Sequence, residues 1–137
     1  MASGSEHPFV FHLVQAVLWN KTVADDSIYY PPTFDVDGFT HGTSNPQKLL
    51  SVANHFYLDV KGDWYCLKMT VESLTASGVE TVYEGTAPVG EKPADFDGAE
   101  GELFPHIMGG LLPSAVLEVL SVQRADDGTF LSVGRVA

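Results

Sequence analysis

The chain has 137 residues, of which 45% are hydrophobic and 18% are charged, a composition typical of one globular domain with a single core. Acidic residues outnumber basic residues by 18 to 7, and the formal net charge is −11, which disfavours nucleic acid and anionic membranes as partners. The single cysteine, Cys66, excludes an internal disulfide. We therefore expect one cytoplasmic domain over residues 1–137, either a monomer or a small homo-oligomer.

The first third of the chain predicts a strand, a helix and an irregular loop. Residues 8–14 are an apolar strand, and residues 15–21 favour a short helix. The segment 25–37 contains two tyrosines followed by two prolines, and prolines interrupt regular structure. We interpret this segment as a lid over a pocket.

The next elements are a short strand over residues 38–43 and a helix over residues 45–58. Ser44 and Gln47 have the spacing of a capping box, and Pro46 suits the first turn of a helix. Backbone N–H groups at such a helix start could hold an anionic or carbonyl oxygen. The alternative is that Ser44 only caps the helix.

The rest of the chain predicts strands separated by turns. Residues 64–71 alternate between apolar and polar side chains, and residues 79–84 form another short strand. Residues 85–102 are an acidic loop, residues 103–108 are a strand, and residues 115–134 contain a hairpin with an Asp-Gly turn. The expected fold is α+β, with a small split sheet, mixed or antiparallel, and about two helices.

Three histidines lie where apolar segments meet glycine turns: His12, His41 and His106. In one pocket, a neutral imidazole could accept a proton while a charged one donates, as acid–base catalysis requires. Three imidazoles could instead bind zinc or ferrous iron, but their long spacings match no local metal motif. In a third reading, each ring donates to a backbone carbonyl and organises a strand end.

Several of these segments form an ordered pattern. They are His12 followed by Trp19, then Gly38-Phe39-Thr40-His41 with Ser44 and Gln47, then Tyr83-Glu84, and finally Phe104-Pro105-His106-Ile107-Met108-Gly109. This pattern covers most of residues 9–122 and resembles the family known as domain of unknown function 952. The resemblance implies a compact fold similar to the ADP-ribosyltransferase superfamily, which includes the tRNA 2′-phosphotransferases.

The resemblance also implies roles for individual residues. His12 matches a first-strand histidine that contacts a nucleotide ribose, His41 and Ser44 match the polar second motif, and Glu84 is the candidate acidic residue of the third. Met108 departs from the tyrosine usual in the family. The cation near these motifs is Lys48, and no arginine lies near them in the sequence. Phosphotransferase chemistry is expected to use arginines, so this argues against it.

The sequence thus predicts an enzyme that acts on a small, nucleotide-like or other metabolite by acid–base catalysis. The predicted catalytic residues are His12, His41, His106 and Glu84, and the predicted substrate-binding residues are Trp19, Tyr29, Tyr30, Phe39, Thr43, Ser44 and Met108. We predict no metal site and no required cofactor, with a metal ion or a nicotinamide nucleotide as the alternatives. The alternatives are a non-catalytic binding module that uses the same pocket and a protein-interaction domain that uses the Tyr-Pro loop.

Overall fold

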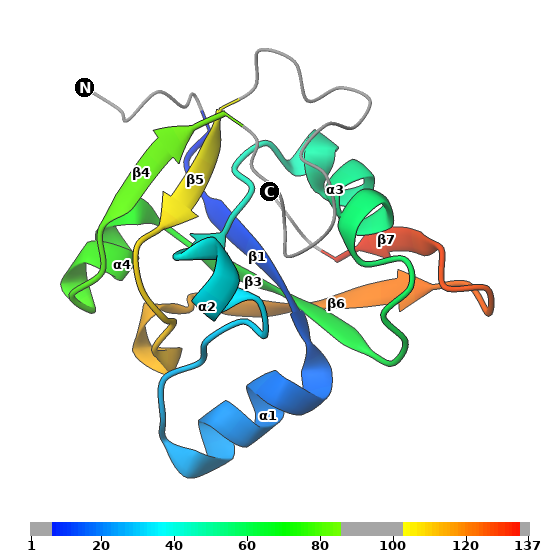
Figure 1. The fold of residues 1–137 in the computed structure, drawn as a ribbon, viewed down its shortest axis with the longest axis horizontal. Helices are drawn as coiled ribbons and strands as arrows, with labels where there is room; N and C mark the ends of the chain where they lie inside the picture. Colours follow the sequence, from blue (N-terminus) through cyan, green and yellow to red (C-terminus); the bar gives the residue numbers. More distant parts are fainter. Residues whose placement is uncertain (1–6, 86–102, 135–137) are drawn as a thin grey trace.

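Two antiparallel sheets form the framework of the described part of the protein (Figure 1). The computed structural model describes residues 7–85 and 103–134. The larger sheet has the strand order β1-β3-β6-β7, and the smaller sheet has the order β2-β5-β4. The strands are β1 (Val10–Gln15), β2 (Thr40–His41), β3 (Trp64–Met69), β4 (Thr81–Glu84), β5 (Phe104–Ile107), β6 (Glu118–Arg124) and β7 (Phe130–Val133).

Four α-helices accompany the sheets in the described ranges, so the fold is α+β. They are α1 (Ala16–Asp25), α2 (Phe34–Asp37), α3 (Leu49–Phe56) and α4 (Val71–Ala76), with 3-10 turns at Pro46–Lys48 and Pro113–Ala115. None of these helices has the length and apolar character needed to cross a membrane.

Strands β1 and β3 of the larger sheet are covered on both faces. Between the two sheets, Val10 and Val14 of β1 pack with Leu67 of β3 and Ile107 of β5. The opposite face of β1 and β3 packs against α3 and β7; the buried residues there are Phe11, Leu13, Leu49, Ala53, Trp64, Cys66, Leu120 and Phe130. Burial raises the pKa of the Cys66 thiol to about 12, so this cysteine is a core residue and not a nucleophile.

The two sheets meet where β1 lies beside the segment that follows β2. The backbone of Phe11 exchanges two hydrogen bonds with Thr43, at 2.7 and 2.8 Å. The chain just before this bridge forms β2, which turns away from β1 and pairs with β5. This branch point brings β1 close to the histidines of the smaller sheet.

The predicted strands and the terminal hairpin are confirmed, but the helices differ from the prediction. The described residues contain four α-helices rather than two, and α1 continues to Asp25. The predicted capping box at Ser44 is wrong. Asn45 caps instead, because its side-chain oxygen accepts from the N–H of Gln47, and Ser44 Oγ bonds the Tyr83 hydroxyl at 2.9 Å.

The strand predicted over residues 64–71 ends two residues early, at Met69. Thr70 and Ser73 form a reciprocal capping box that starts α4, and two strong cap bonds outweigh a continued strand pattern. The segment 25–37, predicted to be an irregular lid, contains α2 and is anchored through a backbone bridge from Tyr29 to Leu111. In the predicted acidic loop, residues 86–102 lie outside the described residues.

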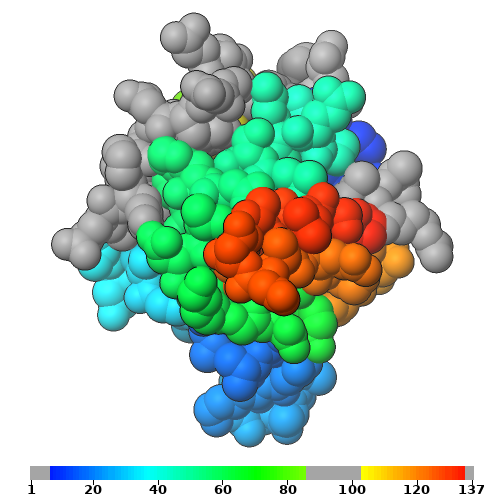
Figure 2. Space-filling view, turned by 90° about the vertical axis from the view of Figure 1, so that its right-hand side faces the viewer, coloured from blue at the N-terminus to red at the C-terminus, as the bar shows by residue number. Residues whose placement is uncertain are grey.

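Helix α3 protects the edge strand β7. Figure 2 shows the two elements side by side, and Asn54 of α3 makes two hydrogen bonds to the backbone of Phe130. Its amide nitrogen donates to the Phe130 carbonyl at 3.1 Å, and its oxygen accepts from the Phe130 N–H at 2.7 Å. The side chain therefore takes the place that a further strand would occupy.

We expect Asn54→Ala to lower the free energy of unfolding by about 1–3 kcal/mol, because two backbone groups of Phe130 lose their partners. Urea unfolding of the variant and of the parent measures this loss. Ser51→Ala, at an exposed position of the same helix, is the control and should leave the midpoint nearly unchanged. Equal midpoints for the Asn54 variant and the parent would contradict the assigned role.

Candidate functional site

His41 and His106 are direct neighbours on one face of the smaller sheet. They pair across β2 and β5, and their ring centroids lie 6.3 Å apart. The adjacent pair, Thr40 and Ile107, is fully buried, and Ile107 points into the core between the sheets. Because side chains alternate along a strand, the two histidines occupy the opposite face of the smaller sheet.

Each of these two histidines lies within 3.0 Å of a carboxylate oxygen. His41 Nε2 lies 2.9 Å from Asp37 Oδ2, and the two side chains are 16% and 5% exposed. His106 Nδ1 lies 3.0 Å from Glu84 Oε1, and its Nε2 lies 3.2 Å from the carbonyl of Gly85. In its doubly protonated form, His106 therefore has an acceptor for each ring N–H.

Phe39 braces both imidazoles. Its ring stacks on His106 at 4.0 Å with an interplanar angle of 9°, and it lies 4.5 Å from the ring of His41. The chain reaches this position through Gly38, whose φ of +82° ends α2 in the left-handed region that favours glycine. Phe39 therefore packs against His41 and His106 from one side.

His12 joins the cluster through the backbone. Its Nδ1 lies 2.6 Å from the carbonyl oxygen of His41, so Nδ1 carries the proton and donates. The ring is 3% exposed and lies 5.8 Å from the ring of Tyr29. Its other nitrogen, Nε2, is buried without a hydrogen-bond partner among the described residues.

Burial sets the charge state of two of the histidines. It lowers the pKa of His12 from 6.5 to about 4, against the opposing effect of the bond to the His41 carbonyl. Burial also lowers the pKa of His41, while Asp37 raises it and the nearby His106 lowers it further. His12 is therefore neutral at pH 7, with a lone pair on Nε2, and His41 is biased toward the neutral form.

The remaining predicted residues fall into two groups. Glu84 contacts His106 directly, and Ser44 is bonded to Tyr83, on the strand that carries Glu84. Thr43 is buried and makes the backbone bridge to Phe11.

The predicted aromatic surface is divided between core and solvent. Trp19 and Tyr29 are 3% and 5% exposed and belong to the core beneath the histidines, where their rings meet edge to face. Tyr30 is exposed and packs against Phe34, and Met108 is 47% exposed. These residues therefore do not form one continuous recognition surface.

The described residues contain no group of three His, Cys, Asp or Glu side chains that could hold a metal ion. Two of the three imidazoles already have oxygen partners in place of a metal ion. Nδ1 of His12 is directed at a carbonyl, and both nitrogens of His106 already have acceptors.

Two residues of the cluster were missed by the sequence analysis, Asp37 and Tyr83. Asp37 lies four residues before His41 and directly before Gly38. A carboxylate preceding a glycine turn that leads to a histidine was a usable signal. Tyr83 belongs to the ordered pattern of the sequence, but its contact with Ser44 has no sequence signal, because it depends on the arrangement of the two sheets.

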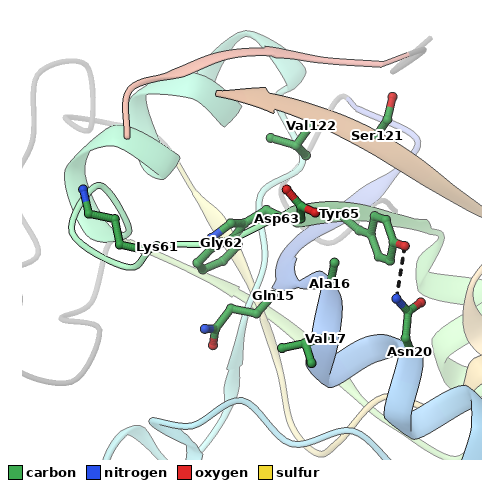
Figure 3. A pocket seen from close by; sticks show the side chains of 11 residues that line it. Gln15, Ala16, Val17, Asn20, Lys61, Gly62, Asp63, Tyr65, Ser121 and Val122 are labelled. Carbon is green, nitrogen blue, oxygen red and sulfur yellow. Dashed lines mark hydrogen bonds between the residues drawn. The ribbon is translucent and has the colours of Figure 1, made fainter. Parts of the chain in front are cut away.

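A separate hollow of about 500 Å³ lies between the start of α1 and strands β3 and β6 (Figure 3). Its polar lining includes Asn20, whose amide donates to the Tyr65 hydroxyl at 3.3 Å, together with Lys61, Asp63 and Ser121. None of the predicted site residues lines this hollow. We therefore place the candidate site at His12, His41 and His106.

The fold and the histidine cluster define a small α+β domain with paired imidazoles on one sheet. The sequence profile of the family described as "Protein of unknown function (DUF952)" matches residues 13–119. The chain therefore belongs to this family. No curated protein matches the sequence.

Solved structures similar to the chain come from protein CC0527 of Caulobacter crescentus. Its crystal structure is 17% identical, has a TM-score of 0.66, and the match covers 90% of this chain and 93% of that one. Its solution NMR structure is 18% identical, has a TM-score of 0.54, and the match covers 88% and 89% of the two chains. This likeness shows a shared fold.

The buried His12 predicts acid sensitivity. In the folded state the pKa of His12 is about 4, against 6.5 for an ordinary histidine. Between these pH values the unfolded state binds a proton at His12 and the folded state does not. Between pH 6.5 and 4 the free energy of unfolding should therefore fall as the pH falls, by about 3 kcal/mol from His12 alone. Urea unfolding at a series of pH values measures this change.

His12→Gln keeps an N–H donor for the His41 carbonyl but does not titrate, so its stability should depend less on pH over the same window. His55→Gln in α3 controls for the loss of a histidine and should follow the parent. Parallel stability curves for the parent and His12→Gln would show that His12 is not the buried neutral group described here.

Proposed function

We propose that the protein is an enzyme that acts on a small molecule by general acid–base catalysis, with His41 and His106 as the proton-transferring groups. One observation carries the proposal: two imidazoles lie 6.3 Å apart, and each is oriented by a carboxylate. Paired histidines with different partners are suited to opposite roles in proton transfer.

The surroundings favour His41 as the base and His106 as the acid. Burial lowers the pKa of His41, so the neutral ring can accept a proton from the substrate. His106 in its protonated form is matched by Glu84, whose side chain is 61% exposed and can give way to a substrate atom. Hydrolysis, elimination, isomerisation and cyclisation are all compatible with this pair.

We further propose an arrangement similar to the ADP-ribosyltransferases. The branching of two antiparallel sheets and the position of His12 in the first strand support it. In such an arrangement, Nε2 of His12 accepts a hydrogen bond from a hydroxyl of a nucleotide-like or other small metabolite. The net charge of −11 supports a small ligand in the cytoplasm over a nucleic acid or a membrane.

A non-catalytic binding module is the second candidate, and one observation favours it. The buried Nε2 of His12, which has no hydrogen-bond partner within residues 7–85 and 103–134, offers a ligand contact that requires no proton transfer. In that case a ligand binds saturably and is recovered unchanged.

The test begins with a metabolite extract incubated with the parent protein and analysed by mass spectrometry for compounds that are consumed and formed. His41→Ala should lower the rate of conversion by about 10²–10⁴-fold, the usual contribution of a general base. His41→Gln, which keeps an N–H donor for the buried Asp37, serves as a second variant if the alanine variant folds poorly. His55→Ala is the control and should retain the parent rate.

A thermal-shift screen with ADP-ribose and nicotinamide and adenine nucleotides complements this assay. A ligand at a hundred times its dissociation constant adds about 2.7 kcal/mol of stability. Conversion by His41→Gln at the parent rate would overturn the catalytic proposal. Binding with the ligand recovered unchanged would favour the binding module.

A further inference from the structure

We propose that Asp37 is a positioning residue that holds the proton of neutral His41 on Nε2 and leaves Nδ1 as the atom that accepts a proton from the substrate. This inference rests on the proposed function and deepens it, because it names the reacting atom of the base.

The geometry of the pair carries the inference. An ionised carboxylate can only accept hydrogen bonds, so the 2.9 Å contact between Asp37 Oδ2 and His41 Nε2 requires a proton on Nε2. A neutral imidazole has one N–H, so the lone pair then lies on Nδ1. The carboxylate is 5% exposed, which shields this bond from competing water.

The local chain geometry keeps Asp37 in place. Its own N–H donates to the carbonyl of Thr33 at 2.9 Å, and the next N–H, that of Gly38, donates to Phe34 at 2.8 Å. After the left-handed turn at Gly38, the chain enters β2 and returns His41 to the carboxylate. The Asp37–His41 pair is largely buried, whereas the Lys21–Asp25 pair, which has the same spacing along the chain, is exposed on α1.

The groups that face His41 come from three elements besides its own. Asp37 of α2 favours the protonated ring, while His106 of β5, itself bonded to Glu84 of β4, disfavours it. From β1, the ring of His12 contacts the His41 backbone. Asp37 therefore opposes the effect of burial on the pKa of His41. For His12, whose ring is bonded to a carbonyl instead of a carboxylate, burial outweighs that bond and lowers the pKa to about 4.

The decisive measurement is the tautomer of His41 by NMR of protein labelled with ¹⁵N-histidine. In the parent, His41 should carry its proton on Nε2. In Asp37→Ala the preference for that tautomer should be lost, and in Asp37→Asn, which keeps an acceptor but removes the charge, the pKa of His41 should fall. Asp35→Asn removes an exposed carboxylate from the same helix and should change neither quantity.

The parent spectrum tests the inference even if the Asp37 variants fold poorly. A parent His41 protonated on Nδ1, or an unchanged tautomer and pKa in the folded Asp37 variants, would overturn it. Turnover is the separate readout. Asp37→Asn should lower the turnover rate by about tenfold or more, and should lower the apparent pKa of the base in the pH profile of turnover. If the tautomer follows Asp37 but His41→Gln retains turnover, the catalytic proposal falls and the positioning of His41 by Asp37 stands.

Discussion

The hydrogen bond from His12 to the carbonyl of His41 is the contact on which the site depends. Strand β2 is the edge of the smaller sheet, and the backbone groups on such an edge need partners when they are buried. The ring N–H of His12 supplies one at 2.6 Å, just beyond the bridge between Phe11 and Thr43. The His12 side chain connects the two sheets at the point where β2 diverges from β1, and it fixes the position of the His41 backbone.

Three histidines acquire three different environments from this arrangement. His12 is buried and donates to a carbonyl, and its neutral ring keeps one nitrogen without a partner in the part of the chain that the structure describes. His41 is balanced between burial and the carboxylate of Asp37, and His106 is held by the exposed Glu84 and stacked on Phe39. The chemical differences among identical side chains thus come from their neighbours, which gives the proposed acid and base their separate roles.

Much of the framework could be predicted from local patterns. Strand β3 and the hairpin with the Asp-Gly turn before β7 depend on neighbouring residues, and both are confirmed. The alternation predicted for β3 does not appear in its burial, because Cys66 and Lys68 are buried as well as Leu67 and Met69. The start of α4 was missed because the apolar alternation appeared to run through Val71, whereas the capping box at Thr70 decides the local structure. The cap of the helix after residue 44 was misassigned because the hydroxyl of Ser44 is used by Tyr83, a partner on a distant strand.

By itself, the sequence determined the α+β class, the positions of the strands, the acidic charge and the segments that carry the histidines. These properties follow from composition and from patterns over a few residues. The tertiary structure decided that His41 and His106 are neighbours, that His12 reaches them through the backbone, and that Asp37 and Glu84 are their partners. Those pairings, apart from the short turn between Asp37 and His41, join residues far apart in the chain, and strand register and burial set them only after the two sheets have packed.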